Sequence, residues 1–167
     1  MAGESGPTYQ LVLRKRSRGY EVVYRRDGEA LLHMGGKSAE KIFRVLTEEL
    51  EKLGAAKQAQ KTEVEEVYEV APEHGSTVAA YLLLVRRSRN PDKWIPTLRG
   101  IIEGKYPGLP QALGKMIDAA IEASKYTPLK PKRVNTVIAP KVADAFSAGL
   151  KRLVEKMVKM YERAQQG

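Results

Sequence analysis

Hydrophobic and polar residues alternate over the first part of the chain with the two-residue period of a β-strand. This alternation predicts three strands, at Thr8–Arg14, Tyr20–Arg26 and Glu29–Met34. Asp27-Gly28 is a strong signal for a two-residue hairpin between the second strand and the third. The three strands are therefore expected to form an antiparallel β-meander.

A helical period replaces the alternation after residue 36. Apolar residues three and four positions apart predict a helix that Ser38 caps and that Gly54 ends after Leu53. Further along, β-branched residues predict a strand at Thr62–Val70, and the unbroken apolar run Thr77–Val85 predicts a buried strand, so that the two would form a second hairpin.

Helices are predicted over residues 90–103 and 110–125, and a Pro- and Lys-rich extended connector over residues 126–137. Residues 140–165 then predict one long helix with a heptad repeat of apolar positions. Such a repeat is typical of a coiled-coil seam, although an amphipathic helix lying on the core of its own domain has the same pattern. We expect self-association into a dimer or tetramer through Phe146, Leu150, Leu153, Met157 and Met160.

Together these elements predict an α+β fold, in which an antiparallel β-meander sheet packs with helices and a long C-terminal helix follows. The expected domains are a basic α+β domain over residues 1–137 and an oligomerisation helix over residues 138–167.

The composition removes several classes of function. The chain has no cysteine and only two histidines, which excludes disulfides and cysteine metal sites and leaves little for a zinc site or a Ser-His-Asp relay. No apolar run reaches membrane-spanning length, and the first residues lack the pattern of a signal peptide. We therefore expect a cytoplasmic protein with no metal, no cofactor and no catalytic residues.

The net charge of +9 favours a polyanionic partner, because each phosphate that binds a lysine or arginine releases condensed counterions. The excess lies in the second half of the chain, where residues 76–167 carry seventeen Lys and Arg against seven Asp and Glu. A surface rich in Lys, Arg and Glu is also typical of thermophilic proteins, which offers a second explanation for the charge.

One segment imitates a phosphate-binding loop. Gly35-Gly36-Lys37-Ser38 lies between a predicted strand and a predicted helix, as the end of a P-loop does. The motif also needs a glycine where this chain has Leu31, and a strand-to-helix turn capped by Ser38 explains the same residues. We therefore do not expect nucleotide hydrolysis, although a helix N-terminus can hold a single phosphate.

Basic residues interleaved with aromatic ones form the candidate binding constellation. Single-stranded nucleic acid needs cations along its phosphates and flat rings on which exposed bases stack. The residues expected to contact phosphates are Arg14, Arg16, Arg18, Arg25, Arg86, Arg87 and Lys93. The residues that could stack on bases are Tyr20, Tyr24 and Trp94. Either tyrosine could equally face the core, and a tryptophan near the start of a helix is more often a packing anchor than a stacking platform.

The order of the parts resembles the ThermoDBP and ThermoDBP-related proteins, single-stranded DNA-binding proteins of hyperthermophilic archaea. The meander at residues 8–34 and the apolar ladder from Phe146 to Met160 carry this resemblance. It implies a non-catalytic protein that shields single strands with little sequence preference and oligomerises through its C-terminal helix. No binding residue of the family aligns with a particular position of this chain.

We therefore expect an oligomeric, sequence-tolerant single-stranded DNA-binding protein. One alternative is a protein that binds RNA or the ribosome through the same basic residues. Another is an assembly factor that contacts protein partners through its heptad helix and its acidic middle segment, residues 37–75.

Overall fold

The computed structural model of the chain describes residues 6–88, 90–126 and 136–166, and it divides the chain into two compact units. The first unit comprises residues 1–75 and 130–137, and the second comprises residues 76–129 and 138–167. The division therefore differs from the expected boundary between residues 137 and 138. The extended connector expected over residues 126–137 lies mostly outside the described residues.

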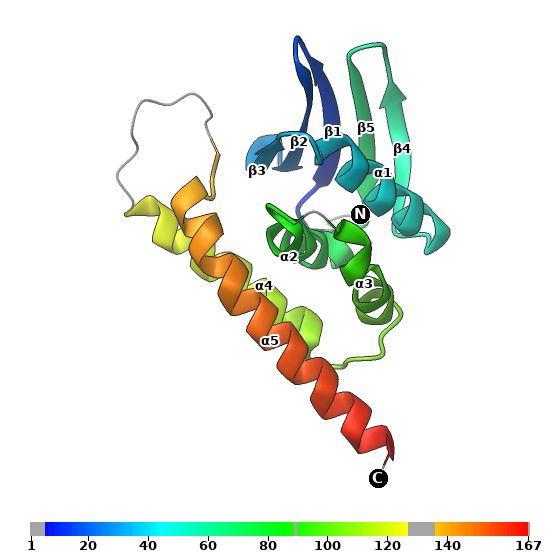
Figure 1. The fold of residues 1–167 in the computed structure, drawn as a ribbon, viewed down its shortest axis with the longest axis vertical. Coiled ribbons are helices and arrows are strands. Elements are labelled where there is room, and N and C mark those ends of the chain that lie inside the picture. The colour runs from blue at the N-terminus through cyan, green and yellow to red at the C-terminus, as the bar shows by residue number, and fades with distance from the viewer. Residues whose placement is uncertain (1–5, 89, 127–135, 167) are drawn as a thin grey trace. The chain divides into compact units, whose positions relative to one another are not determined.

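The first unit is built on a five-stranded antiparallel sheet with the strand order β3-β2-β1-β5-β4 (Figure 1). The predicted meander is confirmed, since β1, β2 and β3 pair in chain order. Asp27 and Gly28 form its second turn with φ angles of 51° and 83°, the positive values that a two-residue hairpin turn requires. The five strands are β1 (Tyr9–Arg16), β2 (Gly19–Arg26), β3 (Glu29–Gly35), β4 (Ala56–Lys61) and β5 (Glu65–Val70).

Helix α1 (Ala39–Lys52) packs on one face of this sheet and buries the apolar stripe that the sequence predicts. Phe43 of α1 meets Tyr68 of β5 edge-on, with ring centroids 5.6 Å apart. Arg44 donates two hydrogen bonds, of 2.7 and 2.8 Å, to the buried carboxylate of Glu66. These hydrogen bonds hold the pKa of Glu66 below its usual range.

The ends of α1 agree with the prediction in position but differ in one detail. Ser38 occupies the N-cap position, yet its side chain forms no capping hydrogen bond. The backbone N–H of Ala39 donates instead to the carbonyl of Gly36 at 3.2 Å. Gly54, with a φ of 70°, follows the last helical residues as expected.

The opposite face of the sheet carries Val12, Val23 and Val67, which are cross-strand neighbours and form a small buried cluster. His33 lies on the same face because it pairs with Val23, and Arg14 does so because it is two positions from Val12. We call this surface the arginine face.

Two predictions for the middle of the chain are wrong. Residues Thr77–Val85 are not a strand but most of helix α2 (Gly75–Val85), which follows the 3₁₀ turn η1 (Pro72–His74). An apolar run without a period suits a helix buried on nearly all sides as well as a buried strand, and its alanines and leucines favour the helix. The hairpin partner of β5 is instead β4, whose mostly exposed side chains leave no alternating pattern to read.

The second unit consists of helices. The predicted helix over residues 90–103 forms as the 3₁₀ turn η2 followed by α3, and the two later helices are confirmed. Tyr81 of α2 donates a hydrogen bond of 3.0 Å to the carbonyl of Pro91, and Ser147 of α5 donates one of 2.7 Å to the carbonyl of Leu83. Besides α2, the unit contains η2 (Pro91–Trp94), α3 (Ile95–Ile102), α4 (Leu109–Lys125) and α5 (Pro140–Gln166).

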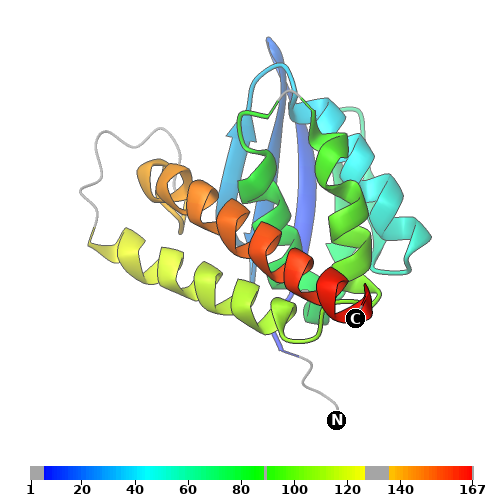
Figure 2. The ribbon, with the colours of Figure 1, turned by 60° about the horizontal axis from the view of Figure 1, so that its bottom comes forward.

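Helices α4 and α5 lie side by side and run in opposite directions (Figures 1 and 2). Gly149 of α5 faces Met116 of α4, since a Cβ atom at Gly149 would lie in ordinary contact with Cε of Met116, at 3.5 Å. At the far end of the pair, the rings of Tyr106 and Tyr161 lie with centroids 5.9 Å apart. The long C-terminal helix therefore packs within the second unit and is not a domain of its own.

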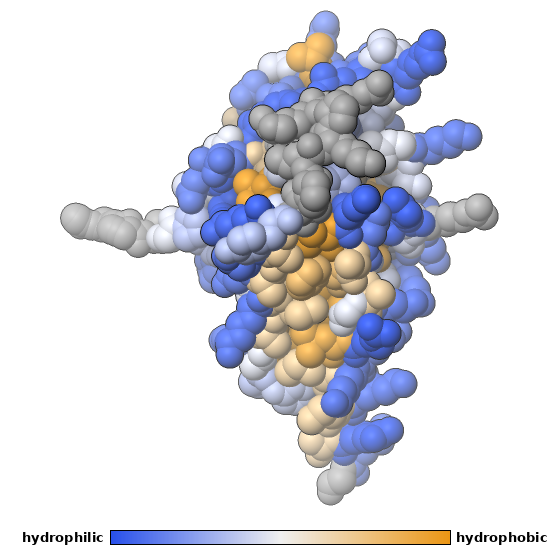
Figure 3. Space-filling view, turned by 90° about the vertical axis from the view of Figure 1, so that its left-hand side faces the viewer, coloured by the Kyte–Doolittle hydropathy of each residue, from blue (hydrophilic) through white to orange (hydrophobic). Residues whose placement is uncertain are grey.

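The apolar stripe of α5 is divided between the core and the surface. Leu150 is fully buried, whereas Phe146, Leu153 and Met157 are half-buried and Met160 is 58% exposed. Figure 3, which views the side where α4 and α5 lie in Figure 1, shows an apolar strip bordered by charged residues. Part of the heptad pattern is thus explained by packing within the unit, and part of it remains at the surface.

Candidate nucleic-acid interface

The residues expected to bind nucleic acid are divided between the two units. Arg14, Arg16, Arg18, Tyr20, Tyr24 and Arg25 belong to the first unit. Arg86, Arg87, Lys93 and Trp94 belong to the second. Each group is therefore described within its own unit.

One end of the sheet in the first unit collects basic residues from three connections. The β1–β2 and β4–β5 turns meet there, where the N–H of Lys15 donates to the carbonyl of Val64 at 2.8 Å. The loop from β3 to α1 reaches the same end, because Glu21 near the start of β2 pairs with Gly35 at the end of β3. We call this region the basic end, and its exposed cations are Lys15, Arg16, Arg18, Lys37 and Lys61.

Only part of the basic end was predicted from the sequence. Lys61 was not among the predicted binding residues, because the strand that carries it was not predicted. Lys37 was noted only as part of the apparent phosphate-binding loop. The sheet topology is the signal that joins these two residues to Arg16 and Arg18.

Among the three aromatic candidates, Tyr20 lies at the basic end. It pairs across the strands with Lys15 and is half-buried, unlike Tyr24 and Trp94. The side chains of Lys15 and Arg18 are exposed and form no ion pair with the described residues. An aromatic ring and two unpaired cations therefore lie on one hairpin.

The structure contradicts a stacking role for Tyr24 and Trp94. Tyr24 is 0% exposed, its ring stacks on Tyr9, and its hydroxyl donates to the carbonyl of Gly75 at 2.8 Å. Burial raises the pKa of this hydroxyl well above its usual value. Trp94 is 7% exposed and packs among apolar side chains of its unit that include Leu98. Both rings are therefore parts of a core. The sequence did not reveal this, because neither strand alternation nor a position near a helix start shows whether a side chain is covered.

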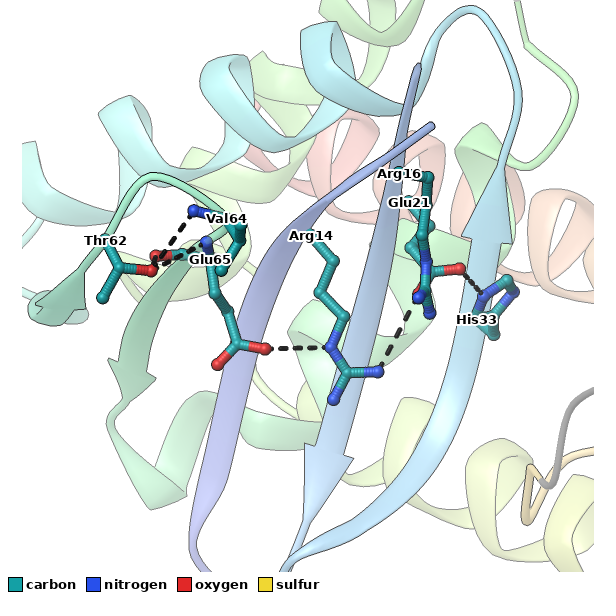
Figure 4. Close-up of polar contacts among 7 residues, drawn as sticks. All are labelled: Arg14, Arg16, Glu21, His33, Thr62, Val64 and Glu65. Carbon is teal, nitrogen blue, oxygen red and sulfur yellow. Dashed lines mark hydrogen bonds and ion pairs between the residues drawn. The ribbon is translucent and has the colours of Figure 1, made fainter. Parts of the chain in front are cut away.

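A row of charged side chains crosses the arginine face near the basic end (Figure 4). Arg14 on β1 donates from Nε to Glu65 on β5 at 2.9 Å, and its Nη1 lies 3.8 Å from Glu21 on β2. Glu21 also accepts a hydrogen bond from Arg16 and lies 2.5 Å from Nε2 of His33 on β3. The row therefore joins four neighbouring strands.

Glu21 is the centre of this row and is only 8% exposed. Burial by itself raises the pKa of its carboxyl. Hydrogen bonds from Arg16 and His33, together with the charges of these two side chains, lower the pKa by more, so that it lies below its usual range. Glu21 is thus ionised near neutral pH. The side chains of Arg14 and Arg16 remain 32% and 56% exposed, so donors face the solvent above a buried acceptor. Arg25, also expected to contact phosphates, lies half-buried on the same face, where it pairs with Gln10.

The basic candidates of the second unit already have partners. Asp144 accepts hydrogen bonds from Arg86 at 2.9 Å and from Arg87 at 3.1 Å. Both arginines, which were expected to contact phosphates, thus already have a carboxylate within the protein. Lys93 is exposed, and its Nζ lies 5.7 Å from the centroid of the Trp94 ring, within range of a cation–π interaction.

Among the described residues, no group of three or more His, Asp or Glu side chains could hold a metal ion. No helix in the same ranges is long and apolar enough to cross a membrane. Comparison of the chain with protein-family models, with curated proteins and with solved structures finds no match.

Proposed function

We propose that the protein binds single-stranded nucleic acid at the basic end, with DNA preferred over RNA, little sequence preference and no catalysis. The observation that carries the proposal is the juxtaposition of Lys15 and Arg18, which are exposed and have no ion pair among the described residues, with the half-buried Tyr20. Arg16, Lys37 and Lys61 extend the positive charge over neighbouring connections of the same sheet. The resemblance to the ThermoDBP proteins points in the same direction.

A single strand suits this combination better than a duplex does. Each cation that meets a phosphate releases counterions whether the strand is single or double. Base stacking on an aromatic ring contributes about 1–3 kcal/mol, and only unpaired bases are free to provide it. Tyr20 is therefore the group that should distinguish single strands from duplexes.

Fluorescence anisotropy with labelled oligo(dT), a matched DNA duplex and a matched RNA, at low and moderate salt, tests the proposal. We expect the tightest binding to oligo(dT), with an affinity that falls steeply as salt rises because counterions are released. Salt-independent binding, or none to any of the three, would refute it. A preference for structured RNA would favour the alternative of an RNA- or ribosome-associated protein.

We also propose that the protein self-associates through the apolar strip on α4 and α5. The support is the apolar strip at the surface (Figure 3), together with the exposure of Met160 and the partial exposure of Phe146, Leu153 and Met157 on α5. Sedimentation velocity over rising protein concentration should reveal a dimer or tetramer. A monomer at every concentration would remove self-association from the proposal, whereas a stable oligomer that binds no polyanion would favour an assembly factor.

A further inference from the structure

We propose that Glu21 organises a phosphate-binding site on the arginine face, in which Arg14 and Arg16 are the donors. The inference rests on the proposed function for the source of the phosphate, which is the backbone of a single-stranded nucleic acid. Its structural basis is the row of contacts around Glu21 (Figure 4).

Arg14 and Arg16 have N–H donors that are not used in contacts within the protein and can bind a phosphate. A guanidinium group has five N–H donors. Arg16 uses Nη2 toward Glu21, and Arg14 uses Nε toward Glu65 while its Nη1 lies 3.8 Å from Glu21. The remaining donors belong to side chains that are 56% and 32% exposed, so a phosphate can reach them from the solvent.

Glu21 is suited to position these donors and does not present its own charge to the ligand. Its side chain is 10% exposed, and it contacts Arg16 and His33 from two neighbouring strands. Because an ionised carboxylate only accepts hydrogen bonds, the nitrogen Nε2 of His33 is the donor in their 2.5 Å contact. His33 therefore fixes Glu21 from one side while Arg16 is held on the other.

The floor of the site is apolar and small. Val12, Val23 and Val67 form the buried cluster of this face, and Arg14 and Glu21 lie two positions along their strands from Val12 and Val23. A low-polarity floor also strengthens the interaction between the guanidinium groups and an incoming phosphate.

The proposed site and the overall charge predict opposite effects of the substitution Glu21→Gln on the affinity for oligo(dT). If charge alone governed binding, Glu21→Gln would tighten the complex, because it removes a negative charge from the protein. If Glu21 positions the donors, Glu21→Gln should instead weaken binding to oligo(dT) about tenfold, equivalent to the loss of one charge-assisted hydrogen bond. Equal or tighter binding by the variant would overturn the proposal.

Glu63→Gln is the matched control. Glu63 is exposed in the β4–β5 turn, and its replacement removes the same charge near the same end of the sheet. Binding by this variant should be unchanged or slightly tighter. Circular dichroism and urea unfolding establish that both variants are folded before their affinities are compared.

A second variant tests the role of the arginine donors in binding and leaves the buried Glu21 unchanged. Arg16→Lys keeps the charge at an exposed position but removes the planar fork that holds Glu21 and a phosphate together. We expect oligo(dT) affinity to fall several-fold, on the order of fivefold. An affinity equal to that of the unmodified protein would count against the site.

A titration with inorganic pyrophosphate distinguishes failure of this site from failure of the proposed function. The titration is followed by NMR at the Nε–H signals of Arg14 and Arg16. Signals that shift in the unmodified protein but not in Glu21→Gln support the site, even if oligo(dT) does not bind. Signals that do not shift in the unmodified protein overturn it, even if oligo(dT) binds elsewhere.

Discussion

Replacing Gly75 with alanine is expected to lower the free energy of unfolding by about 3 kcal/mol, because the added methyl group has no space. A Cβ atom at this position would lie 2.1 Å from Cε2 of Tyr9, far closer than van der Waals contact allows. The ring cannot move aside easily, since it is buried and stacks on Tyr24. The backbone is not the obstacle, because Gly75 has a φ of −58° that alanine adopts readily.

Gly114→Ala is the control for this substitution. Gly114 lies inside α4, where an added Cβ atom would meet only the side chain of Ser76, at 3.8 Å or more. Alanine should stabilise this helix by up to about 1 kcal/mol, since glycine is the poorer helix former. Urea unfolding followed by circular dichroism measures both variants. A Gly75→Ala protein that unfolds at the same urea concentration as the unmodified one would show that the contact with Tyr9 is not restrictive.

Removing two charges from the basic end, as Lys15→Gln with Arg18→Gln, should weaken binding to oligo(dT) about tenfold at moderate salt. Both side chains are exposed and unpaired among the described residues, so the fold should not be affected. The slope of log affinity against log salt should become shallower by about 1.4, because each lost contact with a single strand accounts for about 0.7. Anisotropy titrations at four or more salt concentrations give both quantities.

The same number of charges can be removed from the second unit as Arg86→Gln with Arg87→Gln. The guanidinium groups of these residues already donate to Asp144, so we expect a smaller loss of affinity than at the basic end. The reverse order would mean that the second unit carries the binding surface. Equal losses would mean that only the overall charge of the protein matters.

The sequence predicts well those elements whose signals are local. The meander follows from alternation and from the Asp27-Gly28 turn, and α5 follows from a long heptad pattern. Thr77–Val85 was misassigned because an unbroken apolar run has no period, and the polar strand β4 was missed because it lies at an edge of the sheet with its side chains exposed.

The candidate site was less predictable because it depends on contacts between distant positions. Tyr20 and Tyr24 lie on the same face of β2, so which of them is accessible depends on how far the covering elements extend along the strand, and alternation does not reveal this. Arg86 lies 58 positions from Asp144 in the sequence, and Arg14 lies 51 from Glu65. Both arginine clusters thus pair with carboxylates that the sequence does not place beside them.

The discontinuous first unit has a consequence for synthesis of the chain. The N–H of Val137 donates to the carbonyl of Ala30 on the edge strand β3, at 2.9 Å. A ribosome that adds roughly 5–20 residues per second makes β3 about 5–20 seconds before residue 137 appears. During that interval the edge of β3 lacks this partner, and an unpaired strand edge is a template for pairing with another chain. The carbonyl of Ala30 therefore stays open to another chain while the helical unit is being made, and in fragments that end before residue 137 it would stay open.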